Sequence, residues 1–111
     1  MTISIIKGSI KSTILIILLE YKKMHGYEML NKIRGLYKSR IKISYGAIYP
    51  HLHKLQDEGA LEAEHENVNN RTRIYYQLTS KGRLIAHQAL EDIEEQIQVL
   101  NNILINTNSK H

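Results

Sequence analysis

Residues 44–55, SYGAIYPHLHKL, combine small, aromatic and basic side chains at a spacing that suits contact with a polyanion. In a helix, at 100° per residue, one side of this segment is small near its start and basic further along. That side carries Gly46, Ala47, Pro50 and Lys54, with His51 and His53 at its margins. A helix with little side-chain bulk at its start can lie deep in the DNA major groove, so we expect this side to contact DNA. The alternative is a plain solvated surface.

The other side of the same helix is apolar and aromatic, which predicts that it faces the core. Its residues are Tyr45, Ile48, Tyr49, Leu52 and Leu55. Tyr49 is a DNA-binding candidate as well, because its hydroxyl can reach a phosphate. Ser44 stands at the expected N-cap, where its hydroxyl can accept a hydrogen bond from a free amide, and we include it among the DNA-binding candidates.

Gly46 and Pro50 are the two residue types least suited to a helix interior. Pro50 has no amide, and its ring would clash with the carbonyl of residue 46. Since residue 46 is glycine, its pliant backbone can tilt that carbonyl outward. We expect the pair to remove bulk where DNA comes closest; the alternative is a detail of packing.

Two further regions carry DNA-binding candidates. Arg71 and Arg73 lie near the tip of an expected β-hairpin, where guanidinium groups can grip phosphates or enter a minor groove. Tyr27 opens an expected helix, and contact with a phosphate and packing in the core are equally open to it.

The charge is unevenly distributed along the chain. The net charge is +4, yet between residues 20 and 54 eight lysines and arginines face only two glutamates. Within this part, Lys38, Arg40 and Lys42 precede the helix of residues 44–55 and can neutralise backbone phosphates, although a solvated linker is the alternative. Toward the C-terminus the balance reverses, since four acidic residues lie close together at positions 91–95. This asymmetry predicts a polyanion-binding face and a second face with another role, against the alternative of an ordinary solvated surface.

The pattern of the chain predicts helices over residues 9–23 and 27–38 and a third after Ser44 that ends at Gly59 in the left-handed conformation. Ser9 or Ser12 can cap the first of these helices. The alternative for that segment is a buried strand. The second buries Met29, Leu30, Ile33 and either Leu36 or Tyr37. Alternating apolar residues on both sides of an asparagine-rich turn then predict a hairpin over residues 61–78.

Thr79 is expected to cap a long final helix. Apolar residues recur there at spacings of four and three, which is a heptad seam: Ala86, Leu90, Ile93, Ile97, Leu100 and Leu104. We expect Leu90, Ile93, Ile97, Leu100 and Leu104 to form a dimer interface, together with the first helix of the partner. The fold class is therefore mostly α with a β-hairpin wing. A winged helix-turn-helix occupies residues 1–78, a dimerisation helix residues 79–106 and a disordered tail residues 107–111.

Several classes of function lack support in the sequence. There is no cysteine, and His51 and His53 point about 160° apart on a helix, so we expect no metal site. The sequence contains no glycine-rich phosphate loop, no nucleophile elbow and no pair of carboxylates set in an apolar cleft. We therefore expect neither an enzyme nor a bound cofactor. The longest apolar run, residues 14–19, is short of the roughly 20 residues that span a membrane. With no signal-peptide pattern, we expect a cytoplasmic protein without a membrane partner.

Three stretches, HGYEMLNKI, YGAIYPHLHKLQDEGAL and RTRIYYQLTSKGR, resemble the PadR-like family of winged-helix transcriptional regulators. With the preceding KGSIKSTILIILL, the resemblance covers about residues 7–84, and the final helix is similar to that of the short, single-helix subfamily. The chain has Asn70 where the family often has glycine; asparagine tolerates a left-handed backbone. It also lacks the tryptophan with which some members stack a flat ligand at the dimer interface.

The resemblance implies a cytoplasmic homodimeric repressor that binds double-stranded DNA and is often released by a small molecule. Two recognition helices about 34 Å apart predict a pseudo-palindromic operator with half-sites roughly ten base pairs apart. A cavity between the long helices and the winged-helix core is the expected place for an apolar effector. The alternative function is a winged-helix dimer that acts as a protein-interaction module with a vestigial DNA face.

Overall fold

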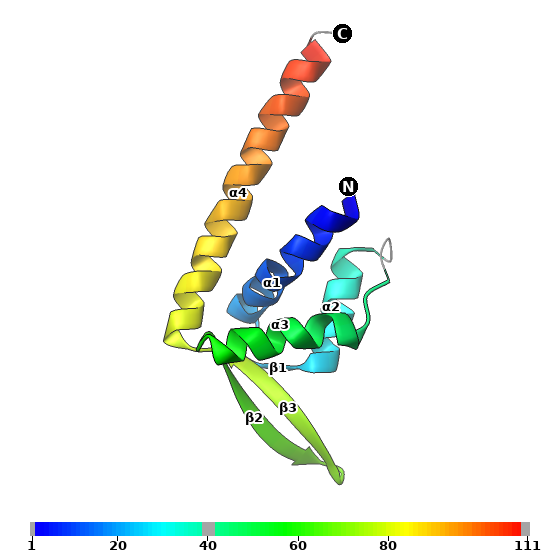
Figure 1. The fold of residues 1–111 in the computed structure, drawn as a ribbon, viewed down its shortest axis with the longest axis vertical. Helices are drawn as coiled ribbons and strands as arrows, with labels where there is room; N and C mark the ends of the chain where they lie inside the picture. The colour runs from blue at the N-terminus through cyan, green and yellow to red at the C-terminus, as the bar shows by residue number, and fades with distance from the viewer. Residues whose placement is uncertain (1, 39–41, 110–111) are drawn as a thin grey trace.

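The computed structural model describes the backbone of residues 2–38 and 42–109 and the side chains of residues 10–38 and 42–108. Figure 1 shows three helices gathered at the centre, a hairpin projecting from them, and a long final helix that diverges from the first. This arrangement confirms the winged helix-turn-helix followed by a long helix. The elements are α1 (Thr2–Glu20), β1 (Met24–His25), α2 (Gly26–Leu36), α3 (Tyr45–Asp57), β2 (Leu61–Val68), β3 (Arg71–Leu78) and α4 (Ser80–Ser109).

The core lies where α1, α2 and α3 meet the base of the hairpin. The largest fully buried side chains come from all three helices: Ile14, Leu15, Leu18, Met29, Ile33, Ile48, Leu52 and Leu55. The three aliphatic residues expected on the inner side of α3 are therefore confirmed as core. Tyr45 packs partly against this core, whereas Tyr49 is 44% exposed, so its assignment to the core is wrong.

The first helix differs from the prediction at both ends. It begins at Thr2 instead of residue 9 and ends at Glu20 instead of residue 23. Ser9 and Ser12 therefore lie inside the helix and cannot be its cap, and the alternative of a buried strand is also wrong. The helix ends early because Met24 must be extended to pair with Tyr76 of β3.

A two-residue strand before α2 was not expected. Met24 and His25 pair antiparallel with β3, which makes a three-stranded sheet in the order β1-β3-β2. His25 is also the N-cap of α2: its Nδ1 accepts the Glu28 amide at 3.3 Å, while Glu28 Oε1 accepts the His25 amide at 3.1 Å. This reciprocal capping box starts the helix at Gly26.

The second helix ends at Leu36, two residues before the expected boundary, and Lys38 has a left-handed backbone (φ 50°). Its inner side buries Met29, Leu30 and Ile33 as predicted. Of the two candidates for the fourth position, Tyr37 packs against the core and Leu36 is exposed.

The hairpin turns through Asn69 and Asn70, whose φ angles are 52° and 65°. Two consecutive left-handed residues are typical of a type I′ turn, and asparagine adopts them readily. The strands pair along the whole predicted hairpin, from Leu61 opposite Leu78 to Val68 opposite Arg71. Near its base Tyr76 and Leu78 are buried, whereas His65 is exposed because the strands extend beyond the core.

The ends of α3 behave differently from each other. Gly59 has φ 79° and ends the helix as predicted: its amide donates to Gln56 O at 3.0 Å and the Ala60 amide donates to Leu55 O at 2.9 Å. At the start, Ser44 is the N-cap by its backbone, but its hydroxyl makes no capping hydrogen bond. The prediction that this hydroxyl caps the helix is therefore wrong. Instead, the backbone carbonyl of Ser44 accepts a hydrogen bond from the Ala47 amide at 3.1 Å.

Thr79 caps α4 as expected. Its hydroxyl accepts the Gly82 amide at 2.9 Å and donates to Gly59 O at 2.6 Å, which ties the final helix to the end of α3. The helix continues through Ser109, beyond the boundary expected at residue 106, because no glycine or proline interrupts residues 83–109. Residues 107–109 of the expected tail are therefore helical, and residues 110–111 lie outside the described part of the chain.

Tyr45 and Tyr76 link α3 to the central strand of the sheet. Their hydroxyl groups influence each other, and Tyr76 is only 3% exposed. Burial, followed by the influence of Tyr45, raises the pKa of Tyr76 from 10.0 to about 12. The folded protein thus retains the Tyr76 proton at a pH where an unfolded tyrosine has lost it.

This raised pKa predicts a loss of stability at alkaline pH. The contribution of Tyr76 is fully present below pH 10.0 and is lost as the pH rises toward about 12. Tyr76→Phe removes the titrating hydroxyl, so its free energy of unfolding should fall less steeply than that of the wild type across this window. Chemical denaturation at a series of pH values measures this, with Tyr27→Phe, an exposed hydroxyl, as the control. Parallel profiles for wild type and Tyr76→Phe would contradict the prediction.

Candidate nucleic-acid interface

The outward side of α3 is open and carries little bulk near its start. Gly46, Ala47, Pro50 and Lys54 are all exposed, and His51 at the margin is half-buried. A Cβ added to Gly46 would meet nothing closer than Ser44 Oγ at 3.6 Å. Packing among the described residues therefore gives no reason for glycine at this position, and the small surface is open to a partner that approaches from outside.

Aromatic rings line the side of α3 that borders α2. Tyr27 stacks on Tyr45 with ring centroids 4.8 Å apart and an interplanar angle of 13°. Tyr45 is followed by Tyr49 at 5.9 Å, and Tyr49 by His53 at 6.2 Å. Tyr27 is 63% exposed, so of its two expected roles the structure excludes burial in the core. Tyr49 is 44% exposed as well, so both tyrosines of this row that are DNA-binding candidates are open to an approaching partner.

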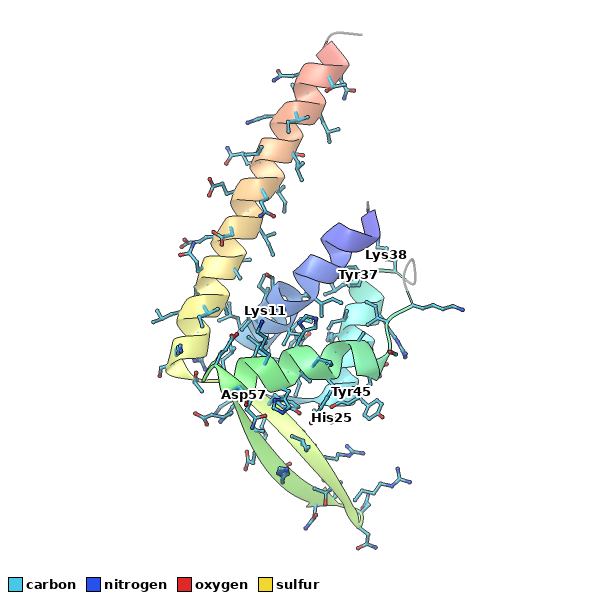
Figure 2. All side chains as sticks on the ribbon, in the orientation of Figure 1. Lys11, His25, Tyr37, Lys38, Tyr45 and Asp57 are labelled. Atoms are coloured by element: carbon cyan, nitrogen blue, oxygen red, sulfur yellow. The ribbon has the colours of Figure 1, made fainter. Side chains whose placement is uncertain are left out.

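Gly26 makes room for this row of rings. A Cβ at Gly26 would collide with the ring of Tyr45, so only glycine lets Tyr45 lie across the start of α2. Figure 2 shows Tyr45 at the start of α3 beside His25, with which it lines the same groove. Gly26 was not among the candidates from the sequence, because nothing in the spacing of the HGY segment says which ring covers it.

A groove of about 430 Å³ runs between the start of α2 and the wing. It brings Tyr27 and Tyr45 together with Arg71 and Arg73, which lie more than forty positions later than Tyr27 in the chain. Both arginines are exposed, and no ion pair of the described residues includes either of them. Two unpaired guanidinium groups beside exposed phenol rings are suited to phosphate oxygens.

The segment that leads into α3 is held by an arginine that sequence reasoning did not single out. Arg34 Nε donates to Ile43 O at 3.0 Å, immediately before the N-cap Ser44. Lys42, one residue earlier, is exposed as a phosphate contact requires. Lys38 is exposed as well, whereas Arg40, the middle member of the expected basic stretch, lies outside the described residues.

The remaining titratable groups near this surface do not form another kind of site. Within residues 10–38 and 42–108, no group of three His, Asp or Glu side chains is placed to hold a metal ion. His53 Nδ1 lies 3.2 Å from Asp57 Oδ2 on the same helix. None of the described helices is both long and apolar enough to cross a bilayer. The arrangement is thus one of exposed cations and hydroxyl groups around a small helical surface.

The heptad residues of α4 divide into two groups. Ala86 is buried, and Leu90 and Ile93 are half-buried in the part of α4 that runs beside α1. Farther along, Ile97, Leu100 and Leu104 are more than half exposed. The expected dimer residues are therefore not equivalent in the single chain. Other exposed apolar residues of α4, outside the expected seam, are Leu84, Val99, Ile103 and Ile105.

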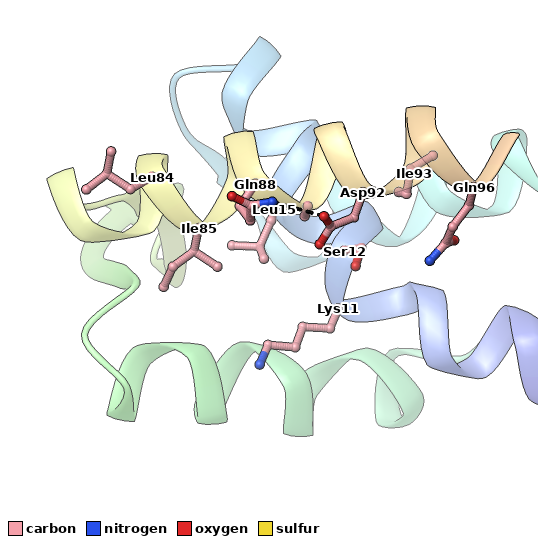
Figure 3. A pocket seen from close by; sticks show the side chains of 10 residues that line it. Lys11, Ser12, Leu15, Leu84, Ile85, Gln88, Asp92, Ile93 and Gln96 are labelled. Carbon is pink, nitrogen blue, oxygen red and sulfur yellow. Dashed lines mark hydrogen bonds between the residues drawn. The ribbon is translucent and has the colours of Figure 1, made fainter. Parts of the chain in front are cut away.

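A second groove, of about 700 Å³, lies between α1 and α4 (Figure 3). Leu15, Ile85 and Ile93 supply apolar walls, while Lys11 and Asp92 bring charge to its rim. The cavity expected between the long helices and the winged-helix core stays a prediction, and this groove is the candidate for it within one chain.

The comparisons with known proteins agree with this architecture. The family model of the transcriptional regulator PadR-like family matches residues 14–88, which is more than half of the chain. A PadR-like transcriptional regulator from Bacillus cereus is 26% identical, with a TM-score of 0.79, over 91% of this chain and 96% of that chain. A transcriptional regulator from Clostridium thermocellum is 25% identical, with a TM-score of 0.75, over 89% and 93%.

A third similar structure was solved with nucleic acid. Bacillus subtilis PadR in complex with operator DNA is 26% identical, with a TM-score of 0.63, over 72% of this chain and 45% of that chain. No curated protein sequence matches the chain. The family match covers α2, α3 and the wing, which are the elements that form the surface described above. The chain belongs to the PadR-like family of transcriptional regulators.

Proposed function

We propose that this protein is a sequence-specific DNA-binding regulator of transcription that acts as a homodimeric repressor on a pseudo-palindromic operator. The observation that carries the proposal is the open, small surface of α3 around Gly46, together with Arg71 and Arg73. Both arginines share a groove with Tyr45 at the start of α3 and form no ion pair within the described residues. The solved complex of Bacillus subtilis PadR with operator DNA supports the same use of this fold. A regulator of this kind acts where the DNA is, so we also propose a cytoplasmic location.

In the proposed complex, α3 enters the major groove and the wing follows the adjacent backbone. Gly46, Ala47 and Pro50 allow the start of α3 to approach the bases closely, because their side chains add little bulk. Lys42, Lys54 and the wing arginines neutralise phosphates, which makes the affinity strongly dependent on salt. Ser44, Tyr27, Tyr49 and His51 border this surface and supply donors to the sugar-phosphate backbone.

The proposed dimer forms through α4. Ile97, Leu100 and Leu104 are exposed on one seam of a helix that extends past the winged-helix core. Contact with a second copy would bury them, and would complete the burial of Leu90 and Ile93, together with α1 of the partner. An apolar small molecule is the proposed effector, with the α1–α4 groove as its binding site. Filling this groove would alter the angle between α4 and the DNA-binding elements.

Reversing two charges on the proposed interface tests DNA binding. Lys54→Glu combined with Arg73→Glu should weaken binding to the operator by at least about 100-fold at roughly 150 mM salt, since each site then repels phosphates. The operator is first selected from genomic fragments that the wild type retains, and affinity is measured by fluorescence anisotropy. Light scattering checks that the double variant remains dimeric.

Lys32→Glu combined with Arg83→Glu is the control, because it changes the net charge equally at exposed positions outside the proposed surface. Equal losses in the two double variants would show a general charge effect. If the wild type binds the selected fragment no better than random DNA, the proposal fails and the protein-interaction module becomes the better explanation.

Bulk at Gly46 tests the close approach of α3. Gly46→Leu should leave the fold intact, because a side chain there points into open space, yet it should reduce operator affinity by at least about 2 kcal/mol, the scale of one lost base pair contact. Gly35→Leu is the matched control, since Gly35 has nothing within 4 Å of an added Cβ and lies on α2 outside the interface. Normal operator binding by Gly46→Leu would show that the Gly46–Pro50 pair is only a packing detail.

A charge on the α4 seam tests the dimer. Ile97→Asp should give a monomer by light scattering, because a carboxylate would be buried without a partner in the helical interface. Val99→Asp is the control: Val99 is 51% exposed and Ile97 52% exposed, but the two side chains are about 160° apart around the helix. A dimeric Ile97→Asp variant would contradict the proposed seam.

A further inference from the structure

One face of the wing places carboxylates opposite a proposed DNA-binding arginine. Residues 62, 64, 66 and 68 of β2 share this face with residues 71, 73, 75 and 77 of β3, because alternate residues of a strand point the same way. In the register of the two strands, Glu66 lies directly opposite Arg73 and Glu64 opposite Tyr75. Side chains directly opposite on antiparallel strands are close enough to form an ion pair. Arg73 nevertheless takes part in none of the ion pairs among the described residues.

Lys23, instead of Arg73, forms ion pairs with these carboxylates. Its Nζ lies 2.8 Å from Glu66 Oε1 and 3.6 Å from Glu64 Oε2. Lys23 directly precedes β1, so its side chain reaches over the central strand to the far strand of the sheet, and its Nζ lies 5.2 Å from the ring centroid of Tyr75 on the way. The hydrogen bond to Glu66 is the main cause of a raised pKa of Lys23.

We infer that Lys23 is a positioning residue for DNA binding: it holds Glu64 and Glu66 so that Arg73 stays free for a phosphate. Without Lys23, Glu66 is released next to Arg73, and a guanidinium group pairs with a carboxylate in the same bidentate geometry that it uses for a phosphate. The carboxylate and the DNA then compete for one arginine. This inference rests on the proposed contact of Arg73 with DNA.

Replacing two neighbouring lysines separates this role from a general loss of charge. Lys23→Met and Lys22→Met remove the same charge at adjacent positions, and Lys22 is exposed. Lys23→Met should weaken operator binding about fivefold more than Lys22→Met, a factor on the scale of one exposed ion pair in each subunit. The slope of log affinity against log salt should also become shallower by about 1.8, or 0.9 for each arginine of the dimer. Lys23→Arg, which keeps the pairing, should retain the affinity.

Second-site variants test whether the loss acts through Arg73. In an Arg73→Gln background, Lys23→Met should cause no loss beyond that of Lys22→Met, because the arginine that it protects is absent. Adding Glu66→Gln to Lys23→Met should restore both affinity and salt slope. Glu62→Gln is the control for removing a negative charge, since Glu62 lies opposite Gln77 and accepts its amide at 3.2 Å.

The possible outcomes separate the inference from the proposed function. If the wild type binds no operator, the proposed function fails. If it binds and Lys23→Met equals Lys22→Met, or if the Lys23→Met loss persists in full in the Arg73→Gln background, Lys23 is not a positioning residue. Thermal unfolding of each variant checks that the protein remains folded. Rescue by Glu66→Gln would also exclude an unfolded wing as the cause, because removing one carboxylate would not refold it.

Discussion

The ring of Tyr45 is the contact on which the arrangement of this protein depends. It lies over Gly26 at the start of α2, stacks on Tyr27, and interacts through its hydroxyl with Tyr76 in the central strand of the sheet. One residue of α3 therefore touches both of the elements that flank the proposed interface. Tyr76 is buried, and the Tyr45 ring lies so close to Gly26 that a Cβ there would collide with it. Packing in the core therefore sets the angle between α3 and the wing. The small surface near Gly46 and the wing arginines are thus held in one fixed relation.

Features with a local cause could be predicted from the sequence. The inner side of α3, its end at Gly59 and the turn through Asn70 follow from periodicity and backbone preference, which act within a few residues. Strand β1 could not be predicted, because it depends on pairing with β3, fifty positions away in the chain. The role of Gly26 was equally hidden, since a glycine does not reveal which distant ring needs its space. At the site, the candidate residues followed from charge and bulk, whereas the groove that joins Tyr27 to the arginines follows only from the fold.

The final helix shows a different limit of sequence reasoning. Its heptad pattern indicates an apolar seam but does not say what buries each part of it. The structure shows that Ala86 belongs to the core of the chain itself, and that Leu90 and Ile93 are already half covered where α4 runs beside α1. In the later part, Ile97 and Leu104 remain more than half exposed among the described residues. A single periodic pattern therefore serves two purposes, and α4 connects the core directly to the surface that we propose for dimerisation.

A DNA-binding surface must keep its cations free, although folding brings carboxylates within their reach. In this protein the nearby acidic groups are engaged by other partners. Asp57, one turn from Lys54, lies beside His53, and Glu66, opposite Arg73, is held by Lys23. Each of these pairs is exposed, so its contribution to the free energy of folding is small. The larger effect is on which charges remain available, because a cation that already has a carboxylate partner must lose it before it can bind a phosphate. The distribution of ion pairs thus helps to determine the basic surface as directly as the positions of the lysines and arginines do.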